Sequence, residues 1–111
     1  MKYGEIYLVD FDKSVGHEYH GKRPALIIQS DKQLKRTNMI SVMPLTSQMN
    51  NPHDDDIAIS RDEENRLFGK SLIKVHQIKS FDRDRFIKKI GKAKPEILEK
   101  VKNYLRIHFG I

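Results

Sequence analysis

The sequence predicts a mainly β protein of the α+β class, a small barrel-like β domain with a helix at its C-terminus. Short segments rich in β-branched and aromatic residues alternate with turn residues over residues 4–90. One long amphipathic stretch follows at residues 95–109. With 111 residues, of which 38% are hydrophobic, the chain suits a single domain spanning residues 1–111.

Six segments are predicted to form strands. The residue before Pro24 is pushed toward extended backbone, and Ile40, Val42 and Pro44 alternate on one face. The predicted strands cover residues 4–11, 25–29, 39–44, 57–59, 71–78 and 87–90. Polar stretches at residues 13–22 and 46–55 read as long loops, residues 62–68 as a turn, residues 32–37 as a helical turn or connection, and residues 82–86 as a short helix.

The C-terminal helix has the clearest pattern. Pro95 suits the first helical position and Glu96 the positive end of the helix dipole. The apolar and aromatic residues that follow recur at offsets of three and four along residues 97–109, which is typical of one buried stripe. Gly110 suits the residue after the helix end.

Composition excludes several classes of protein. The chain has no cysteine, which removes disulfides, thiolate zinc sites and cysteine nucleophiles. No apolar run approaches the ~18 residues of a membrane span, and the first residues lack the apolar region of a signal peptide. We therefore expect a cytoplasmic protein.

The net charge of +6 is unevenly spread. Residues 1–69 hold nine basic and eleven acidic side chains (−2), whereas residues 70–111 hold twelve basic and four acidic ones (+8). The C-terminal part either has an ordinary basic solvated surface or faces an anionic partner, a nucleic acid or an acidic protein. Charge alone does not choose between these.

The first long loop carries the densest set of reactive side chains, in the run Gly-His-Glu-Tyr-His-Gly-Lys-Arg at residues 16–23. Histidine exchanges protons near neutral pH, and arginine binds phosphate in a bidentate manner without losing its charge. This mixture suits phosphoryl chemistry, although a solvated polar loop would have the same composition. A metal shared by His17 and His20 is disfavoured because their spacing suits a helix and two glycines oppose one. The run from His53 to Asp56 could hold Mg²⁺ but is more typical of a solvated acidic stretch.

A second motif, Pro-Leu-Thr-Ser at residues 44–47, closes the third predicted strand with two hydroxyls. On its own it reads as a strand-end cap. It would have chemical significance if the fold placed it beside Arg23.

Taken together, these segments resemble the MazF/PemK family of toxin endoribonucleases. The resemblance covers about residues 3–90. It rests on GEIYLVDFDKSVGHEYHGKRPALIIQS, then ISVMPLTS, then GKSLIKVHQIKSFDRDRF, in that order. It implies a compact SH3-like barrel of the CcdB–MazF type, a homodimer, and metal-independent, sequence-specific cleavage of single-stranded RNA, with no cofactor. It also implies a type II toxin–antitoxin system in which an acidic antitoxin tail occupies the RNA groove.

The family pattern suggests roles for individual residues. Arg23 and Thr46 match its catalytic pair, and His17 matches the loop histidine of the PemK-like branch. Attack by a ribose 2′-OH needs a base, an acid and a cation over the developing phosphorane charge. In that scheme Arg23 stabilises charge, Thr46 donates a hydrogen bond and His17 exchanges the proton. The predicted RNA contacts are Glu18, Tyr19, His20, Lys22, Ser47, Lys74, His76 and Gln77.

One stretch departs from the PemK-like branch, which carries Arg-x-Asp ahead of its glutamine. Here the stretch reads Lys74-Val75-His76-Gln77. Lysine keeps the positive charge without the fork of arginine, and histidine replaces the carboxylate. His76 could act as a base or read an RNA base, or catalysis could depend on Arg23 and Thr46 without it.

Two alternatives remain open from the sequence. The chain ends Phe109-Gly110-Ile111, which faintly resembles the Trp-Gly-Ile tail of CcdB gyrase poisons, a family of the same fold. A non-catalytic nucleic-acid-binding barrel is the other alternative.

Overall fold

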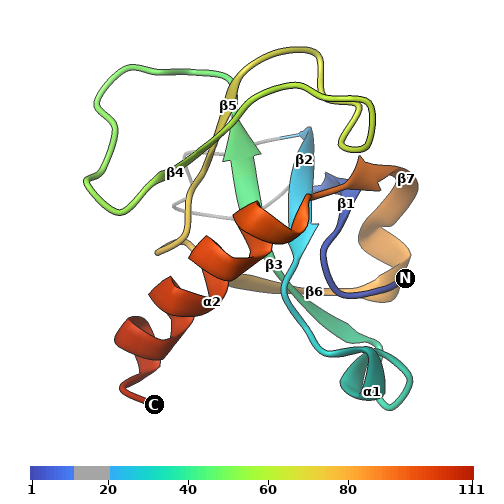
Figure 1. Cartoon of the computed structure of the whole chain (residues 1–111). Coiled ribbons are helices and arrows are strands. Elements are labelled where there is room, and N and C mark those ends of the chain that lie inside the picture. Colours follow the sequence, from blue (N-terminus) through green and yellow to red (C-terminus); the bar gives the residue numbers. More distant parts are fainter. Residues whose placement is uncertain (12–20) are drawn as a thin grey trace.

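Seven antiparallel strands and a C-terminal helix make up the computed structural model, which describes residues 1–11 and 21–111. The strands are β1 (Glu5–Asp10), β2 (Lys22–Ile27), β3 (Met39–Thr46), β4 (Ile57–Ile59), β5 (Ser71–Ile73), β6 (Lys79–Asp82) and β7 (Phe86–Lys92). Two helices, α1 (Asp31–Leu34) and α2 (Pro95–Phe109), and a 3₁₀ turn at Arg83–Arg85 complete the set. Figure 1 shows α2 lying across one side of the sheet.

The strands are ordered β4-β5-β3-β2-β1-β7, and β6 pairs with the first half of β3. β3 is the longest strand and therefore has three partners: β2, β6 toward its start and β5 at its end. Its last two residues, Leu45 and Thr46, pair with Ile73 and Leu72. The predicted mainly β fold with a C-terminal helix is confirmed.

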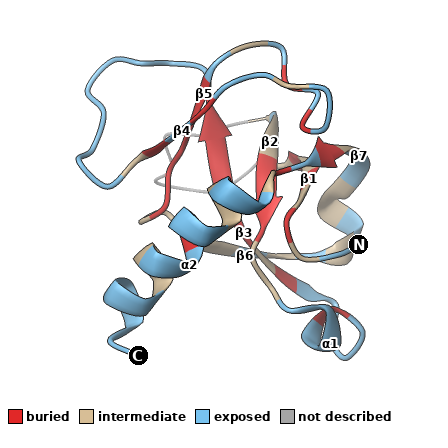
Figure 2. Ribbon diagram, viewed as in Figure 1, coloured by how far each residue is buried: buried red, intermediate tan, exposed pale blue. Residues whose placement is uncertain are grey.

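The buried apolar side chains form two clusters, and Figure 2 shows that buried positions are concentrated in the strands, whereas most of α2 is exposed or intermediate. One cluster includes Ile6, Leu26 and Met43 of the sheet together with Val101 of α2, which is fully buried. The other includes Val9, Ile27 and Val42. Neighbouring residues of β2 and β3 thus point into different clusters, as the alternation of a strand requires.

α2 begins and ends as its sequence predicts. Pro95 occupies its first turn, and Gly110 ends it in the left-handed conformation at φ 69°. The helix packs closely on Gly4, where a Cβ would lie 2.7 Å from a methyl carbon of Leu98. Among the described residues no helix is long and apolar enough to cross a membrane.

The strand predicted at residues 71–78 is wrong in its extent, and β6 (Lys79–Asp82) was not predicted. The strand expected at residues 71–78 ends at Ile73, and the chain then turns before β6 begins at Lys79. Two turn hydrogen bonds, Val75 N to Ile73 O and Gln77 N to Lys74 O, both 3.0 Å, close this turn. Because of this turn, β5 pairs with the end of β3 and β6 pairs with its start. The alternation of residues along the segment does not reveal this change of pairing.

Candidate functional site

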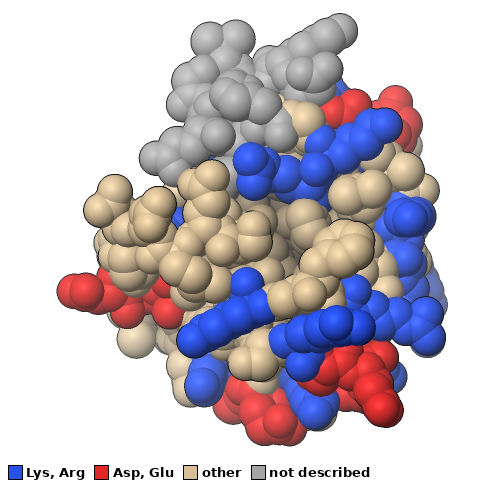
Figure 3. All heavy atoms as spheres, turned by 90° about the horizontal axis from the view of Figure 1, so that it is seen from above, with Lys and Arg blue, Asp and Glu red and all other residues tan. Residues whose placement is uncertain are grey.

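A cavity of about 670 Å³ opens where β2 begins, beside the end of β3. We call it the cationic cavity. Its lining includes the cations Lys22, Arg23, Arg66, Lys88 and Lys89 and no carboxylate from the part of the chain that the structure describes. Figure 3 shows a face on which Lys and Arg side chains lie on either side of a central uncharged area, whereas Asp and Glu lie toward its outline. A concave surface of one charge sign raises the local concentration of an anionic ligand.

Arg23 and Pro-Leu-Thr-Ser come together at this cavity. The pairing of β2 with β3 ends at Ala25 opposite Pro44, so Arg23 and Thr46 each lie two residues beyond its last pair. Arg23 lines the cavity together with Leu45 and Ser47, the two neighbours of Thr46. The fold therefore brings Arg23 and the two neighbours of Thr46 to the same cavity.

Thr46 is buried, with 7% of its surface exposed, and does not itself line the cavity. Its Oγ1 accepts a hydrogen bond of 3.1 Å from the Gln48 backbone N–H. This contact fixes the hydroxyl oxygen and leaves its proton able to donate. Thr46 is thus placed as a donor beside Ser47, which is exposed at the cavity.

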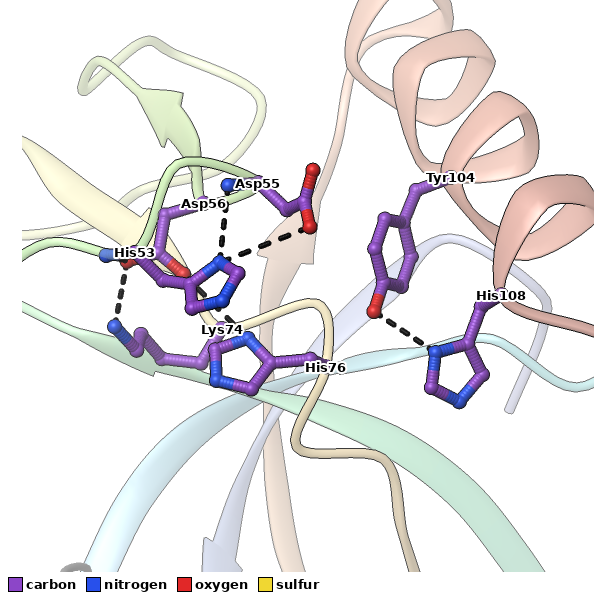
Figure 4. A network of polar contacts seen from close by, with 7 residues as sticks. All are labelled: His53, Asp55, Asp56, Lys74, His76, Tyr104 and His108. Atoms are coloured by element: carbon purple, nitrogen blue, oxygen red, sulfur yellow. Dashed lines mark hydrogen bonds and ion pairs between the residues drawn. The ribbon is translucent and has the colours of Figure 1, made fainter.

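A second group of charged residues, which we call the polar cluster, consists of His53, Asp56, Lys74 and His76 (Figure 4). Lys74 donates to Asp56 Oδ2 at 2.5 Å, and the two side chains are only 10% and 2% exposed. The backbone N–H of His53 donates to the same oxygen at 2.8 Å. Lys74 therefore neutralises a buried carboxylate.

His76 lies at the outer side of the polar cluster. Its Nδ1 is 4.0 Å from Asp56 Oδ1, and its ring lies 4.2 Å from that of His53. Both His76 Nδ1 and Asp56 Oδ1 are buried and lack a hydrogen bond. The nearby Tyr104 hydroxyl pairs with His108 Nδ1 at 2.9 Å, and partial burial, followed by the charge of Asp55, raises the pKa of Tyr104.

The structure places the predicted RNA contacts in three locations. Lys22 and Ser47 line the cationic cavity. Lys74 and His76 belong to the polar cluster, and Gln77 lies half-buried in the turn that follows. The predicted catalytic His17 and the predicted contacts Glu18, Tyr19 and His20 lie outside the described residues. Among the described residues no group of three or more His, Asp or Glu side chains is placed to hold a metal ion.

The sequence does not predict four of the charged and aromatic residues that line the cavity: Arg66, Phe68, Lys88 and Lys89. Arg66 and Phe68 lie in the turn at residues 62–68, which reads as a polar connection. The available signal was an aromatic residue between two cations, Arg66 and Lys70, inside a loop.

The family comparison agrees with this architecture. The model of the PemK-like, MazF-like toxins of type II toxin–antitoxin systems matches residues 2–109. The chain therefore belongs to this family of toxins, and the predicted resemblance is confirmed. This match favours the MazF/PemK alternative over the CcdB-like one.

Individual relatives support the same assignment. The endoribonuclease MazF of Staphylococcus saprophyticus is 27% identical over 111 residues, covering all of this chain and 92% of that protein. The crystal structure of MazF from Deinococcus radiodurans has a TM-score of 0.82 at 21% identity, covering 100% of this chain and 97% of the other. An endoribonuclease from a mycobacterial species, solved with its cognate antitoxin, has a TM-score of 0.78 at 18% identity, covering 100% and 96%.

Proposed function

We propose that this toxin cleaves single-stranded RNA at a short preferred sequence, without a metal ion, by attack of the ribose 2′-OH on the adjacent phosphate. The enzyme class, an endoribonuclease, follows by homology from the family and the Staphylococcus relative. The observation that carries the proposal is the cationic cavity, where Arg23 and the neighbours of Thr46 meet. The whole chain, residues 1–111, acts as one domain in this proposal.

The proposed reaction involves two proton transfers, one from the 2′-hydroxyl and one to the 5′-oxygen. The 2′-oxygen loses its proton and bonds to phosphorus, the bond from phosphorus to the 5′-oxygen breaks, and that oxygen takes up a proton. The products are a 2′,3′-cyclic phosphate and a 5′-hydroxyl. The step needs neither an enzyme nucleophile nor a redox partner, in keeping with a chain that has no cysteine.

Three residues have separate roles in the proposed reaction. Arg23 holds the phosphate and stabilises the charge that develops on its oxygens, for which a guanidinium in a concave site is well suited. The Thr46 hydroxyl donates a hydrogen bond to the phosphate or the 2′-oxygen. His17 takes the proton from the 2′-hydroxyl and, once protonated, gives it to the departing 5′-oxygen. Because DNA lacks the attacking hydroxyl, the reaction is selective for RNA.

The partners follow from the family. We propose that an acidic antitoxin inhibits the toxin by occupying the cationic cavity, by analogy with the mycobacterial endoribonuclease solved with its cognate antitoxin. We also propose a homodimer that acts in the cytoplasm. Light scattering should give twice the 13.0 kDa of one chain, and a monomer at micromolar concentration would contradict the dimer.

Cleavage in EDTA tests the function directly. The wild type should cut a single-stranded RNA in excess EDTA and leave the all-deoxy strand of the same sequence intact. Arg23→Ala should slow cleavage by about 10²- to 10³-fold, the usual loss for one preorganised charge stabiliser, with little change in melting temperature. Arg36→Ala, an exposed arginine away from the cavity, is the matched control and should cut normally. Equal cutting of RNA and DNA, or an undiminished rate in Arg23→Ala, would contradict the proposal.

A further inference from the structure

Phe68 is fully exposed, although it follows the buried residue Leu67. A single exposed aromatic residue is ordinary on a protein surface. Phe68, however, lines the cationic cavity together with Arg66 and Lys88. Its ring is therefore an apolar surface at the wall of a site that attracts anions.

The loop that carries Phe68, residues 62–68, is held by hydrogen bonds of its own side chains. Asn65 is completely buried: its Oδ1 accepts from the backbone N–H groups of Asp62 and Leu67 at 3.1 and 3.0 Å, and its Nδ2 donates to Ser60 O at 2.8 Å. The Asp62 carboxylate accepts from the backbone N–H groups of Glu64 and Asn65 at 2.8 and 2.7 Å. These contacts hold the loop in one conformation, so Phe68 is presented on a fixed support.

The same loop is tied to the sheet. Lys92 N donates to Glu64 O at 3.0 Å, and a Cβ at Gly91 would collide with the backbone carbonyl oxygens of Glu64 and Asn65. Arg66 adopts the left-handed conformation at φ 54°, which costs a non-glycine residue about 1 kcal/mol or more. Strain of this kind persists where the surrounding structure enforces it and is concentrated at functional sites.

The charges beside Phe68 favour a nucleic acid as its partner. Arg66 and Lys88 take part in none of the ion pairs found among the described residues, whereas Lys89 pairs with Glu5 at 2.8 Å. An exposed ring flanked by such cations matches a base next to a phosphate, because aromatic rings stack on any base and cations follow the backbone.

From these observations we infer that Phe68 is a stacking platform for an unpaired base of the RNA, with Arg66 and Lys88 holding the neighbouring phosphates. The inference rests on the proposed function, since it deepens the description of the same site. By alanine substitution, base stacking on an aromatic residue is worth about 1–3 kcal/mol, or about 5- to 150-fold in affinity.

The sequence contains no tryptophan, which allows a direct optical test. In Phe68→Trp the new indole is the only one in the chain, and stacking of a base should quench its fluorescence. The probe is a single-stranded oligonucleotide with 2′-O-methyl riboses, which binds but cannot be cleaved. Phe109→Trp is the matched control, because Phe109 is also exposed but lies at the end of α2, outside the cavity. We expect saturable quenching in Phe68→Trp and none in Phe109→Trp.

Affinity provides a second readout. Phe68→Leu should bind the same oligonucleotide more weakly, by up to the roughly 5- to 150-fold that alanine substitution of a stacking ring costs. Phe68→Tyr should bind like the wild type, and all variants should melt alike because the ring is exposed. If the fluorescence of Phe68→Trp were not quenched, or if Phe68→Leu bound with unchanged affinity, the inference would be overturned. RNA cleavage by the wild type would in that case still support the proposed function. Quenching by an acidic peptide but not by the oligonucleotide would also overturn it and assign the ring to a protein partner. Quenching without RNA cleavage would support the platform and reject the proposed function.

Discussion

The cationic cavity and the polar cluster share no residue and use their positive charges in different ways. In the polar cluster, Lys74 is nearly buried and held by Asp56. In the cationic cavity, five cations line a surface to which the described residues contribute no carboxylate. Removing one partner of a buried ion pair destabilises the fold, whereas a concave surface lined by several cations attracts an anionic ligand. The comparison predicts that changes in the cluster alter stability and changes in the cavity alter RNA binding and cleavage.

The largest expected effect on stability is that of Asp56→Asn. The substitution leaves the Lys74 ammonium buried without its counterion, which costs about 3–5 kcal/mol for pairs of this kind. Urea unfolding measures the loss, and Asp54→Asn, at an exposed neighbouring carboxylate, should cost almost nothing. At a temperature where Asp56→Asn is folded, its cleavage rate should stay within a few-fold of wild type. A stable variant with lost cleavage would reverse the roles assigned to the two regions.

Gly91→Ala tests whether the cavity depends on its anchored loop. The added Cβ meets backbone carbonyl oxygens of Glu64 and Asn65, which cannot rotate away. Overpacking of this kind costs about 1–3 kcal/mol, and displacement of the loop should also weaken binding of the 2′-O-methyl oligonucleotide. Gly69→Ala is the control for the effect on stability, since a Cβ there meets nothing within 4 Å. Unchanged stability in Gly91→Ala would argue against a tightly seated loop.

The smallest expected effect concerns Lys89, the cavity cation that pairs with Glu5 at 2.8 Å. Burial by itself would raise the pKa of Glu5, but hydrogen bonds from Lys89 and from the Lys2 backbone N–H, together with the charge of Lys89, bring that pKa below its usual range. The contact with Glu5 also raises the pKa of Lys89. Since the pKa of Glu5 is lowered on folding, its stabilisation is present above the unfolded pKa and is lost as the pH falls through the folded one.

Glu5→Gln should therefore reduce stability at pH 7 by about 0.5 kcal/mol, as expected for a partly exposed pair, and the difference should vanish at acid pH. It should also raise RNA affinity slightly, because it releases a cation into the cavity. Urea unfolding at neutral and acid pH, together with a binding titration, measures both effects. If Glu5→Gln were still less stable than the wild type at a pH where Glu5 is protonated, the Glu5–Lys89 ion pair would not be the cause of the difference.

Much of this architecture follows from local sequence. The stripe of α2 and its end at Gly110 follow from periodicity and capping, and the convergence of Arg23 with the Thr46 motif follows from strand ends that the family pattern brings together. Such features depend on residues close in the chain or on a motif whose parts occur in order. They were accordingly predictable.

Other features depend on contacts between distant residues. Lys74 reads as a cation available to RNA, but Asp56, eighteen positions earlier, lies against it. Asp56 in turn reads as part of a solvated acidic run, yet its side chain is only 2% exposed. Phe68 reads as part of a turn, and only the packing of that turn on Gly91 brings it to the cavity. Local periodicity carries no information about these pairings.

The central claim is that RNA occupies the cationic cavity and not the polar cluster. Backbone amide NMR spectra of the isotopically labelled protein, titrated with the 2′-O-methyl oligonucleotide, test it most directly. The account predicts that the largest shifts occur at Arg23, Ser47, Phe68 and Lys88, with Asp56 and Lys74 nearly unchanged. Shifts centred on Asp56 and Lys74, with the cavity residues unmoved, would contradict it.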